Sequence, residues 1–180
     1  MSNKMQFGPR VLVMFVAAVL LLKAAPGRSF GGAGYAQTTS GQSLAIIVNQ
    51  SNPVENLSFT ELRRIFLGER SHWPNGRRIT LVIMPPGEPE RDAILREVCR
   101  MNEKDYNNHF LHGLFTGEVF ASPKTLSTPV GVRKFVFNVP GAIGYVRTAD
   151  VDDSVKVLRI DGLLPSDKDY KVQMQARPAK

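Results

Sequence analysis

One segment, residues 52 to 76, constrains the fold more than any other part of the chain. It reads NPVENLSFTELRRIFLGERSHWPNG. Pro53 biases the residue before it away from helix, so the segment begins extended. Ser58 and Glu61 then form a capping box, and Gly68 offers the left-handed residue that ends a helix. The segment therefore predicts an extended turn, a helix from Ser58 to Leu67 and a second turn at residues 73 to 76.

The rest of the chain alternates between strand and helix patterns. Short apolar runs rich in β-branched residues predict strands, and apolar residues three or four positions apart predict helices. The predicted strands are 43–49, 78–84, 142–147 and 155–160. The further predicted helices are 89–100, 103–115 and a short helix to Asn138 that Thr128 caps. This alternation predicts an α/β fold with a small mixed sheet flanked by helices.

The amino terminus has the pattern of an export signal. Residues 1 to 10 are polar with two cations, and Val11 to Leu22 are twelve uninterrupted apolar residues. That run matches a signal-peptide core and falls short of the ~20 residues that span a bilayer. Gly34 and Ala36 suit a cleavage site before residue 37. We expect residues 1–36 to be a signal peptide and processing region of a periplasmic or secreted protein, and an uncleaved anchor is the alternative.

Composition limits what the rest of the chain can be. Residues 37–42 read as a linker, 43–164 as one domain and 165–180 as a polar tail. Four of the 23 basic residues and none of the 16 acidic ones precede residue 37, which leaves a net charge of +3 without a clustered basic face. This argues against a nucleic-acid partner. One cysteine cannot form an internal disulfide, so the core must hold the fold.

Four features, taken in order, resemble a known superfamily. They are Asn52-Pro53, the IFLG run at 65–68, Trp73 and PGAIGYV at 140–146. Their order and spacing resemble the phosphate-type, type II periplasmic binding proteins, which serve ABC transporters and close two α/β lobes over an oxyanion. The resemblance covers roughly residues 44–164. It implies a single lobe and a solute-binding module that is not an enzyme and needs no cofactor.

The chain departs from that superfamily where the ligand should bind. The first lobe and its phosphate loop should precede Leu44, where this chain has the leader and a GGAG stretch at 31–34 that reads as linker. In the second lobe, the superfamily has an arginine followed by Asp-Gly-Ser-Gly-Thr, whose N–H groups and hydroxyls hold the anion. This chain has MPPGEPER at 84–91, with three prolines, no hydroxyl and two glutamates.

We therefore expect an altered or degenerate anion site. Gly87, Arg91, Thr116 and Gly117 remain as ligand candidates, and Arg91 either faces solvent or pairs with a neighbouring acid. The partner would be a small phosphate-like anion, or an envelope protein if the lobe has become an interaction or assembly domain.

Two other clusters suggest different chemistry. A set of cations around one aromatic residue could bind an anionic envelope partner; its members are Arg70, His72, Trp73, Arg77 and Arg78. The alternative is a solvated turn with Trp73 packed on the helix. Cys99 with His109 and His112 could serve a Cys/His-dependent hydrolase, or Cys99 is a small apolar core residue. The two histidines lack a third ligand at suitable spacing, so no metal site is expected.

Overall fold

The computed structural model describes residues 43–174. The predicted signal peptide, cleavage site and linker lie outside the described residues. The strands are β1 (Leu44–Asn49), β2 (Asn56–Leu57), β3 (Thr80–Ile83), β4 (Lys124–Thr125), β5 (Ala142–Arg147), β6 (Val155–Val157) and β7 (Arg159–Ile160). The helices are α1 (Phe59–Phe66), α2 (Pro89–Ile94), the π-helical turn η1 (Leu95–Cys99), α3 (Glu103–Thr116), α4 (Pro129–Asn138) and the 3₁₀ turn η2 (Thr148–Asp150).

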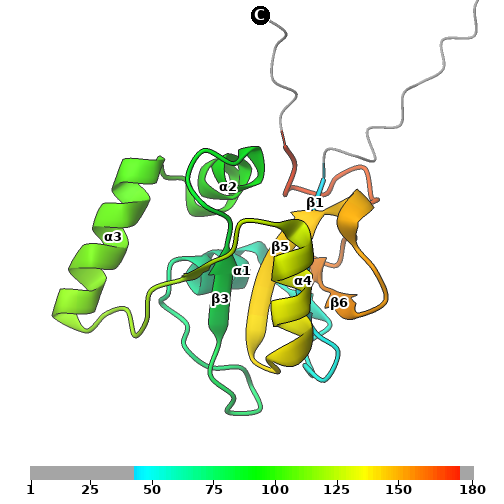
Figure 1. Cartoon of the computed structure of the whole chain (residues 1–180), viewed down its shortest axis with the longest axis horizontal. Helices are drawn as coiled ribbons and strands as arrows, with labels where there is room; N and C mark the ends of the chain where they lie inside the picture. The colour runs from blue at the N-terminus through cyan, green and yellow to red at the C-terminus, as the bar shows by residue number, and fades with distance from the viewer. Residues whose placement is uncertain (1–42, 175–180) are drawn as a thin grey trace, which may run out of the picture. The chain divides into compact units, whose positions relative to one another are not determined.

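Five strands form the central sheet in the order β4-β3-β5-β1-β6 (Figure 1). β3 runs parallel to β4 and β5, whereas β1 runs antiparallel to β5 and β6. The sheet is therefore mixed, as the sequence predicts. β1 and β5 are neighbours, so Ile46 and Ile143 lie in one sheet. A separate parallel pair joins β2 to β7.

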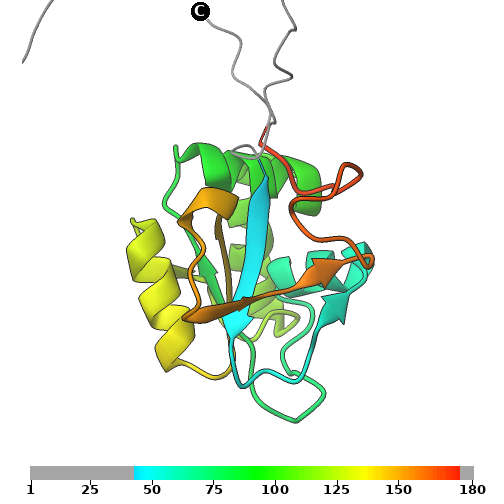
Figure 2. The ribbon, with the colours of Figure 1, turned by 90° about the vertical axis from the view of Figure 1, so that its right-hand side faces the viewer.

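Helices cover both faces of this sheet (Figures 1 and 2). Consecutive residues of a strand point to opposite faces. On β5, a Cβ added to Gly144 would lie 3.0 Å from Val132 of α4, whereas the ring of the next residue, Tyr145, lies 6.0 Å from that of Phe66 of α1. Leu62, Ile65 and Phe66 are all buried, which confirms the predicted apolar face of α1.

Local signals place the ends of α1 where the sequence predicts them. The Ser58 hydroxyl accepts from the Glu61 N–H at 3.2 Å, and the Ser58 N–H donates to the Glu61 carboxylate at 3.0 Å. This capping box also lowers the pKa of Glu61, because the hydrogen bonds from Ser58 favour the charged form. Gly68 follows the helix with φ of 74°.

Tertiary contacts change three predicted elements. The helix predicted at 89–100 becomes a π-helical turn in its last five residues and ends at the left-handed Arg100. The strand predicted at 155–160 is divided, because the Leu158 N–H donates to Ile46 whereas Arg159 pairs with β2. On α3, Leu114 lies at the four-residue spacing of the buried Tyr106 and Phe110 yet is 40% exposed, and Gly113 is buried instead against Val119.

The segment after Leu163 has a weak sequence pattern yet packs on β1. Tyr170 and Val172 are buried. The Tyr170 hydroxyl donates to the Leu44 carbonyl at 2.9 Å, and the Leu44 N–H donates to Val172 at 3.0 Å. The part predicted to be a polar tail thus contributes to the core. Between residues 43 and 174, no helix has the length and apolar character that crossing a membrane requires.

Candidate functional site

The loop from Met84 to Glu88 joins β3 to α2 and occupies the position of the expected anion loop. The Met84 N–H donates to the Tyr145 hydroxyl at 3.0 Å, and the Glu88 N–H donates to the Pro85 carbonyl. Gly87 has φ of 90°, and Pro89 begins α2. Because proline has no N–H, and two other N–H groups are already bonded within the protein, few backbone donors remain for an anion.

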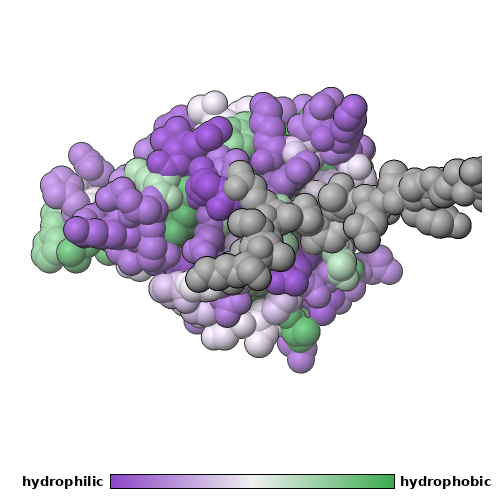
Figure 3. Space-filling view, turned by 90° about the horizontal axis from the view of Figure 1, so that it is seen from above, coloured by the Kyte–Doolittle hydropathy of each residue, from purple (hydrophilic) through white to green (hydrophobic). Residues whose placement is uncertain are grey.

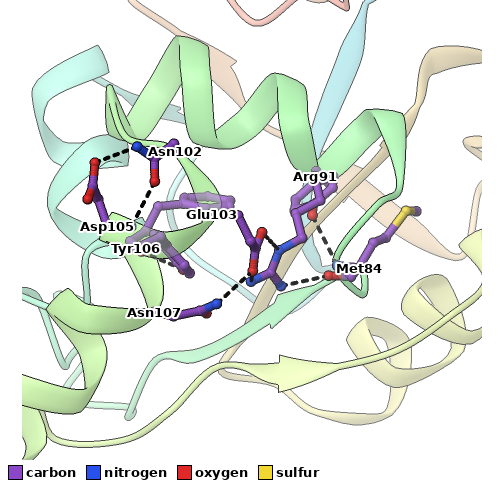
Figure 4. Close-up of polar contacts among 9 residues, drawn as sticks. Met84, Arg91, Asn102, Glu103, Asp105, Tyr106 and Asn107 are labelled. Atoms are coloured by element: carbon purple, nitrogen blue, oxygen red, sulfur yellow. Dashed lines mark hydrogen bonds and ion pairs between the residues drawn. The ribbon is translucent and has the colours of Figure 1, made fainter.

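Arg91 lies beneath this loop and is buried, with 4% of its surface exposed. Its Nε donates to Glu103 Oε2 and its Nη2 to Glu103 Oε1, both at 2.7 Å, and its Nη1 donates to the Met84 carbonyl at 2.8 Å (Figure 4). The guanidinium also lies 5.5 Å from the centre of the Tyr106 ring. The bidentate geometry is the one that arginine adopts with carboxylates and phosphates. A carboxylate of the chain itself therefore occupies the guanidinium face that an anion would need.

Glu103 is fixed in this position from its own helix. It is the first residue of α3, where a negative charge suits the helix dipole, and the preceding Asn102 caps the helix by accepting from the Asp105 N–H at 2.9 Å. Asn107 donates to Glu103 Oε1 at 3.0 Å. Figure 4 shows Glu103 facing the Arg91 guanidinium, with Asn107 hydrogen-bonded to Glu103 from the same helix.

A second ion pair lies at the same edge of the sheet. Glu90 is buried and pairs through Oε1 with Arg147 at the end of β5, while its Oε2 has no hydrogen-bond partner among the described residues. Burial raises the pKa of the neighbouring Tyr145, so its hydroxyl stays neutral. Both glutamates lie at the start of α2, Glu88 as its N-cap residue and Glu90 in its first turn, and the Glu90 carboxylate pairs with a cation.

A cleft of about 370 Å³ lies beside Arg91, between α3 and the segment that contains β4. Its lining is largely apolar, with Ile83, Pro86, Phe110 and Pro123, and Arg91 is its charged residue. The volume falls within the range of small-molecule pockets, but the hydrogen-bonding atoms of Arg91 are turned to Glu103 and Met84.

Several known proteins that are similar to this chain have names that refer to phosphate. The chain is 28% identical over 130 residues to the phosphate-binding protein PstS of Bacillus subtilis, a match that covers 69% of this chain and 38% of that protein. It matches a candidate phosphate ABC transporter substrate-binding protein from Clostridium perfringens, crystallised with bound phosphate, at 23% identity and a TM-score of 0.57. That match covers 69% of this chain and 47% of the other.

An ABC-type phosphate transport receptor from Vibrio cholerae matches at 22% identity and a TM-score of 0.57, over 69% of this chain and 48% of the receptor. No protein-family model matches the chain. The chain is thus similar in sequence to a phosphate-binding protein, and its described domain has a type II periplasmic-binding-protein-like fold. It spans less than half the length of these relatives, and the described domain has the fold of a single lobe, as the sequence predicts.

The four predicted ligand residues do not lie together. Gly87 and Arg91 lie at the end of β3, and Arg91 contacts the first residue of α3. Thr116 is the last residue of α3 and Gly117 its left-handed cap. A helix of 14 residues is roughly 21 Å long, so the two pairs are at opposite ends of it. The structure thus places the four candidates in two pairs along α3, and their role in ligand binding stays a prediction.

The cationic cluster around Trp73 does not form the predicted stacking surface. Trp73 is 2% exposed, and its Nε1 donates to the Gly141 carbonyl at 3.0 Å, so its ring cannot stack on a partner. Arg70 pairs with Glu61 at 3.0 Å, and Arg78 donates to the Phe120 carbonyl at 3.0 Å. The remaining members make local contacts: Arg77 with Ser51, and His72 with Ser71. The alternative of a packed tryptophan beside a solvated turn describes this region.

Cys99 and the two histidines do not form a catalytic arrangement. Cys99 is fully buried, and burial raises the pKa of its thiol to about 12. His109 Nε2 lies 2.8 Å from the Leu67 carbonyl, and His112 is exposed. Among residues 43–174, no group of three or more His, Cys, Asp or Glu side chains could hold a metal. The hydrolase alternative thus lacks an accessible thiolate.

Sequence reasoning missed the residues that complete the site. Glu103 comes from α3, whereas Tyr145 and Arg147 both come from β5, and they meet at the loop only through the fold. One signal was available for Glu103: a carboxylate directly after a helix cap, 12 residues from an arginine that was expected to pair with an acid.

Proposed function

We propose that this domain is an exported binding module of the phosphate-binding-protein type that does not capture free phosphate and acts through contact with an envelope protein. The pairing of Arg91 with Glu103 carries the proposal, because the chain's own carboxylate holds both donors that would form a fork on an oxyanion. Export is supported by the signal-peptide pattern of residues 1–36.

The buried ion pair and the shortage of backbone N–H donors in the loop both support the proposal that the domain does not capture free phosphate. An anion arriving at the loop would have to displace Glu103 from a largely buried cation, and removing one partner of a buried pair costs about 3–5 kcal/mol. It would also meet the prolines in place of N–H donors. The relatives named above bind phosphate by their names, and this chain retains their fold with a different loop.

The test is calorimetric titration with phosphate and sulfate. We expect the wild-type protein to give no saturable heat at micromolar anion, and Glu103→Gln to gain measurable phosphate binding because Arg91 loses its counter-charge. Asp152→Asn is the matched control: it neutralises a carboxylate that pairs with Arg133 elsewhere in the domain and should leave the titration unchanged.

Two results would contradict the proposal. Saturable heat for the wild type at micromolar phosphate would show that the module still captures the anion. A Glu103→Gln variant that is folded by circular dichroism and still shows no heat would show that Glu103 is not what excludes the anion.

A further inference from the structure

The last turns of α3 and the residues after it expose large apolar side chains. Leu111 is 59% exposed, Leu114 40%, Phe115 85% and Phe120 62%. We call these four residues the α3 apolar end. Figure 1 shows α3 at the side of the domain, and Figure 3 shows apolar surface at that side. Exposed apolar side chains are normal when scattered, whereas a group of them on one helix marks an interaction surface.

The geometry of α3 explains why the domain leaves this face open. Tyr106, Phe110 and Gly113 are the buried residues of the helix and form one face. Leu111, Leu114 and Phe115 are spaced three and four apart and form a second face. The chain after the helix folds back to bury Val119 against Gly113, so it covers the first face and leaves the second exposed, with Leu111 and Leu114 at the cleft beside Arg91.

The helix segment that carries Leu111, Leu114 and Phe115 also lacks formal charge. From Tyr106 to Gly117 the sequence contains no Asp, Glu, Lys or Arg. Charged residues make up 22% of the chain, so a stretch of this length and average composition would carry two or three. The core of a protein interface shows this depletion of charge together with enrichment in aromatic residues.

We infer that the α3 apolar end is the surface through which two copies of this chain pair. A twofold interface brings the same patch of both copies together, so the patch must be complementary to its own copy. An apolar, uncharged face meets its own copy without repulsion and offers no charge that would select an oppositely charged partner. This names a partner for the proposed binding module, although the inference does not depend on the state of the anion site.

The exposed area of the α3 apolar end is consistent with the core of such a dimer interface. The four side chains expose on the order of 400 Å² of apolar surface, given the size of aromatic and leucine side chains. A standard interface buries roughly 800 Å² per partner, with an apolar core surrounded by a polar rim. The α3 apolar end would supply the core, and its exposed neighbours Asn108, His112 and Thr116 would supply the rim.

Sedimentation equilibrium of the protein expressed from its full sequence tests the inference. We expect a dimer at micromolar concentration, and Phe115→Lys should weaken it by at least tenfold because the patch loses its most exposed ring and gains two like charges across the twofold axis. Phe137→Lys is the matched control, since Phe137 is also an exposed phenylalanine near the end of a helix, 55% exposed on α4. It should leave the dimer intact.

Each other outcome overturns the inference. A wild-type protein that stays monomeric at 100 µM does not pair through this face, and if it then floats with phospholipid vesicles the face binds lipid instead. A dimer that survives Phe115→Lys, or that Phe137→Lys weakens equally, is built on another surface. Thermal unfolding of both variants distinguishes lost pairing from lost folding.

Discussion

At the scale of single residues, Cys99 shows how burial removes reactivity. The side chain lies in the core, and desolvation raises the pKa of its thiol to about 12, above the ordinary value of 9.0. Between these two values the thiol remains neutral in the folded protein but ionises in the unfolded chain. The unfolded state therefore binds fewer protons, and the free energy of unfolding must fall as the pH rises through this window.

This linkage predicts a measurable alkaline weakening that belongs to Cys99. Between pH 8 and pH 10 the wild-type protein should lose about 1.4 kcal/mol more of its free energy of unfolding than Cys99→Ala does, because only the wild type carries the thiol. Urea unfolding at the two pH values measures both losses. The buried tyrosines, whose pKa values are also raised, are common to both proteins. Equal losses would mean that the thiol is not desolvated.

Other residue-scale features could be predicted only as alternatives. The sequence indicates that Arg91 faces solvent or pairs with an acid, and the fold selects the second through Glu103, on a different helix. For Trp73 the sequence offers a stacking ring with a packed ring as the alternative, and the carbonyl of Gly141, 68 residues away, shows that it is packed. Patterns within the chain cannot rank partners that are brought together by tertiary structure.

At the scale of elements, local chemistry accounts for what was predicted well. α1 and α4 begin where a capping hydroxyl accepts from the backbone, at Ser58 and Thr128, and both signals are contained in four residues of sequence. The division of β6 from β7 was not predictable in this way. It depends on Leu158 donating to Ile46 and Arg159 donating to Glu55, which are contacts across the fold.

The first glycine of the motif PGAIGYV is Gly141, and the close pairing of β5 with β3 requires glycine at this position. A Cβ on Gly141 would lie 2.1 Å from the Arg78 carbonyl oxygen, where no side chain fits. The Gly141 carbonyl also accepts from the Thr80 N–H and from Trp73 Nε1, both at 3.0 Å. Glycine therefore allows β5 to approach the start of β3 closely enough for pairing.

We predict that Gly141→Ala destabilises the domain by about 3 kcal/mol or more, since the backbone must move and leave buried groups unpaired. Gly87→Ala is the comparison: its added Cβ meets nothing within 4 Å, so only the positive φ opposes it, at a cost of about 1–2 kcal/mol. Chemical unfolding of both variants gives the two values. If Gly141→Ala is the milder change, close approach is not the reason for that glycine.

At the scale of the whole molecule, the alternation of strands and helices predicts the α/β class but not the order of the strands. β1 comes first in the described chain, yet in the sheet it lies between β5 and β6. Both of these strands come about a hundred residues later in the sequence. The closing segment is a second case. Tyr170 and Val172 lack a strand pattern, and their burial follows from the unpaired edge that the start of β1 offers them.

The extent of the domain can therefore be tested by shortening the chain. We propose that the folded unit continues at least to Val172, past the predicted boundary at Leu164. Ending the chain at Leu164 removes the buried side chains of Tyr170 and Val172, each contributing about 1.5–3 kcal/mol, and leaves both the N–H and the carbonyl of Leu44 without these partners. We expect this variant to lose about 3–6 kcal/mol in urea unfolding, whereas a chain that ends at Met174 should match the full-length protein. If the two shortened chains were equally stable, the boundary at Leu164 would stand, because Tyr170 and Val172 would then pack on β1 without stabilising it.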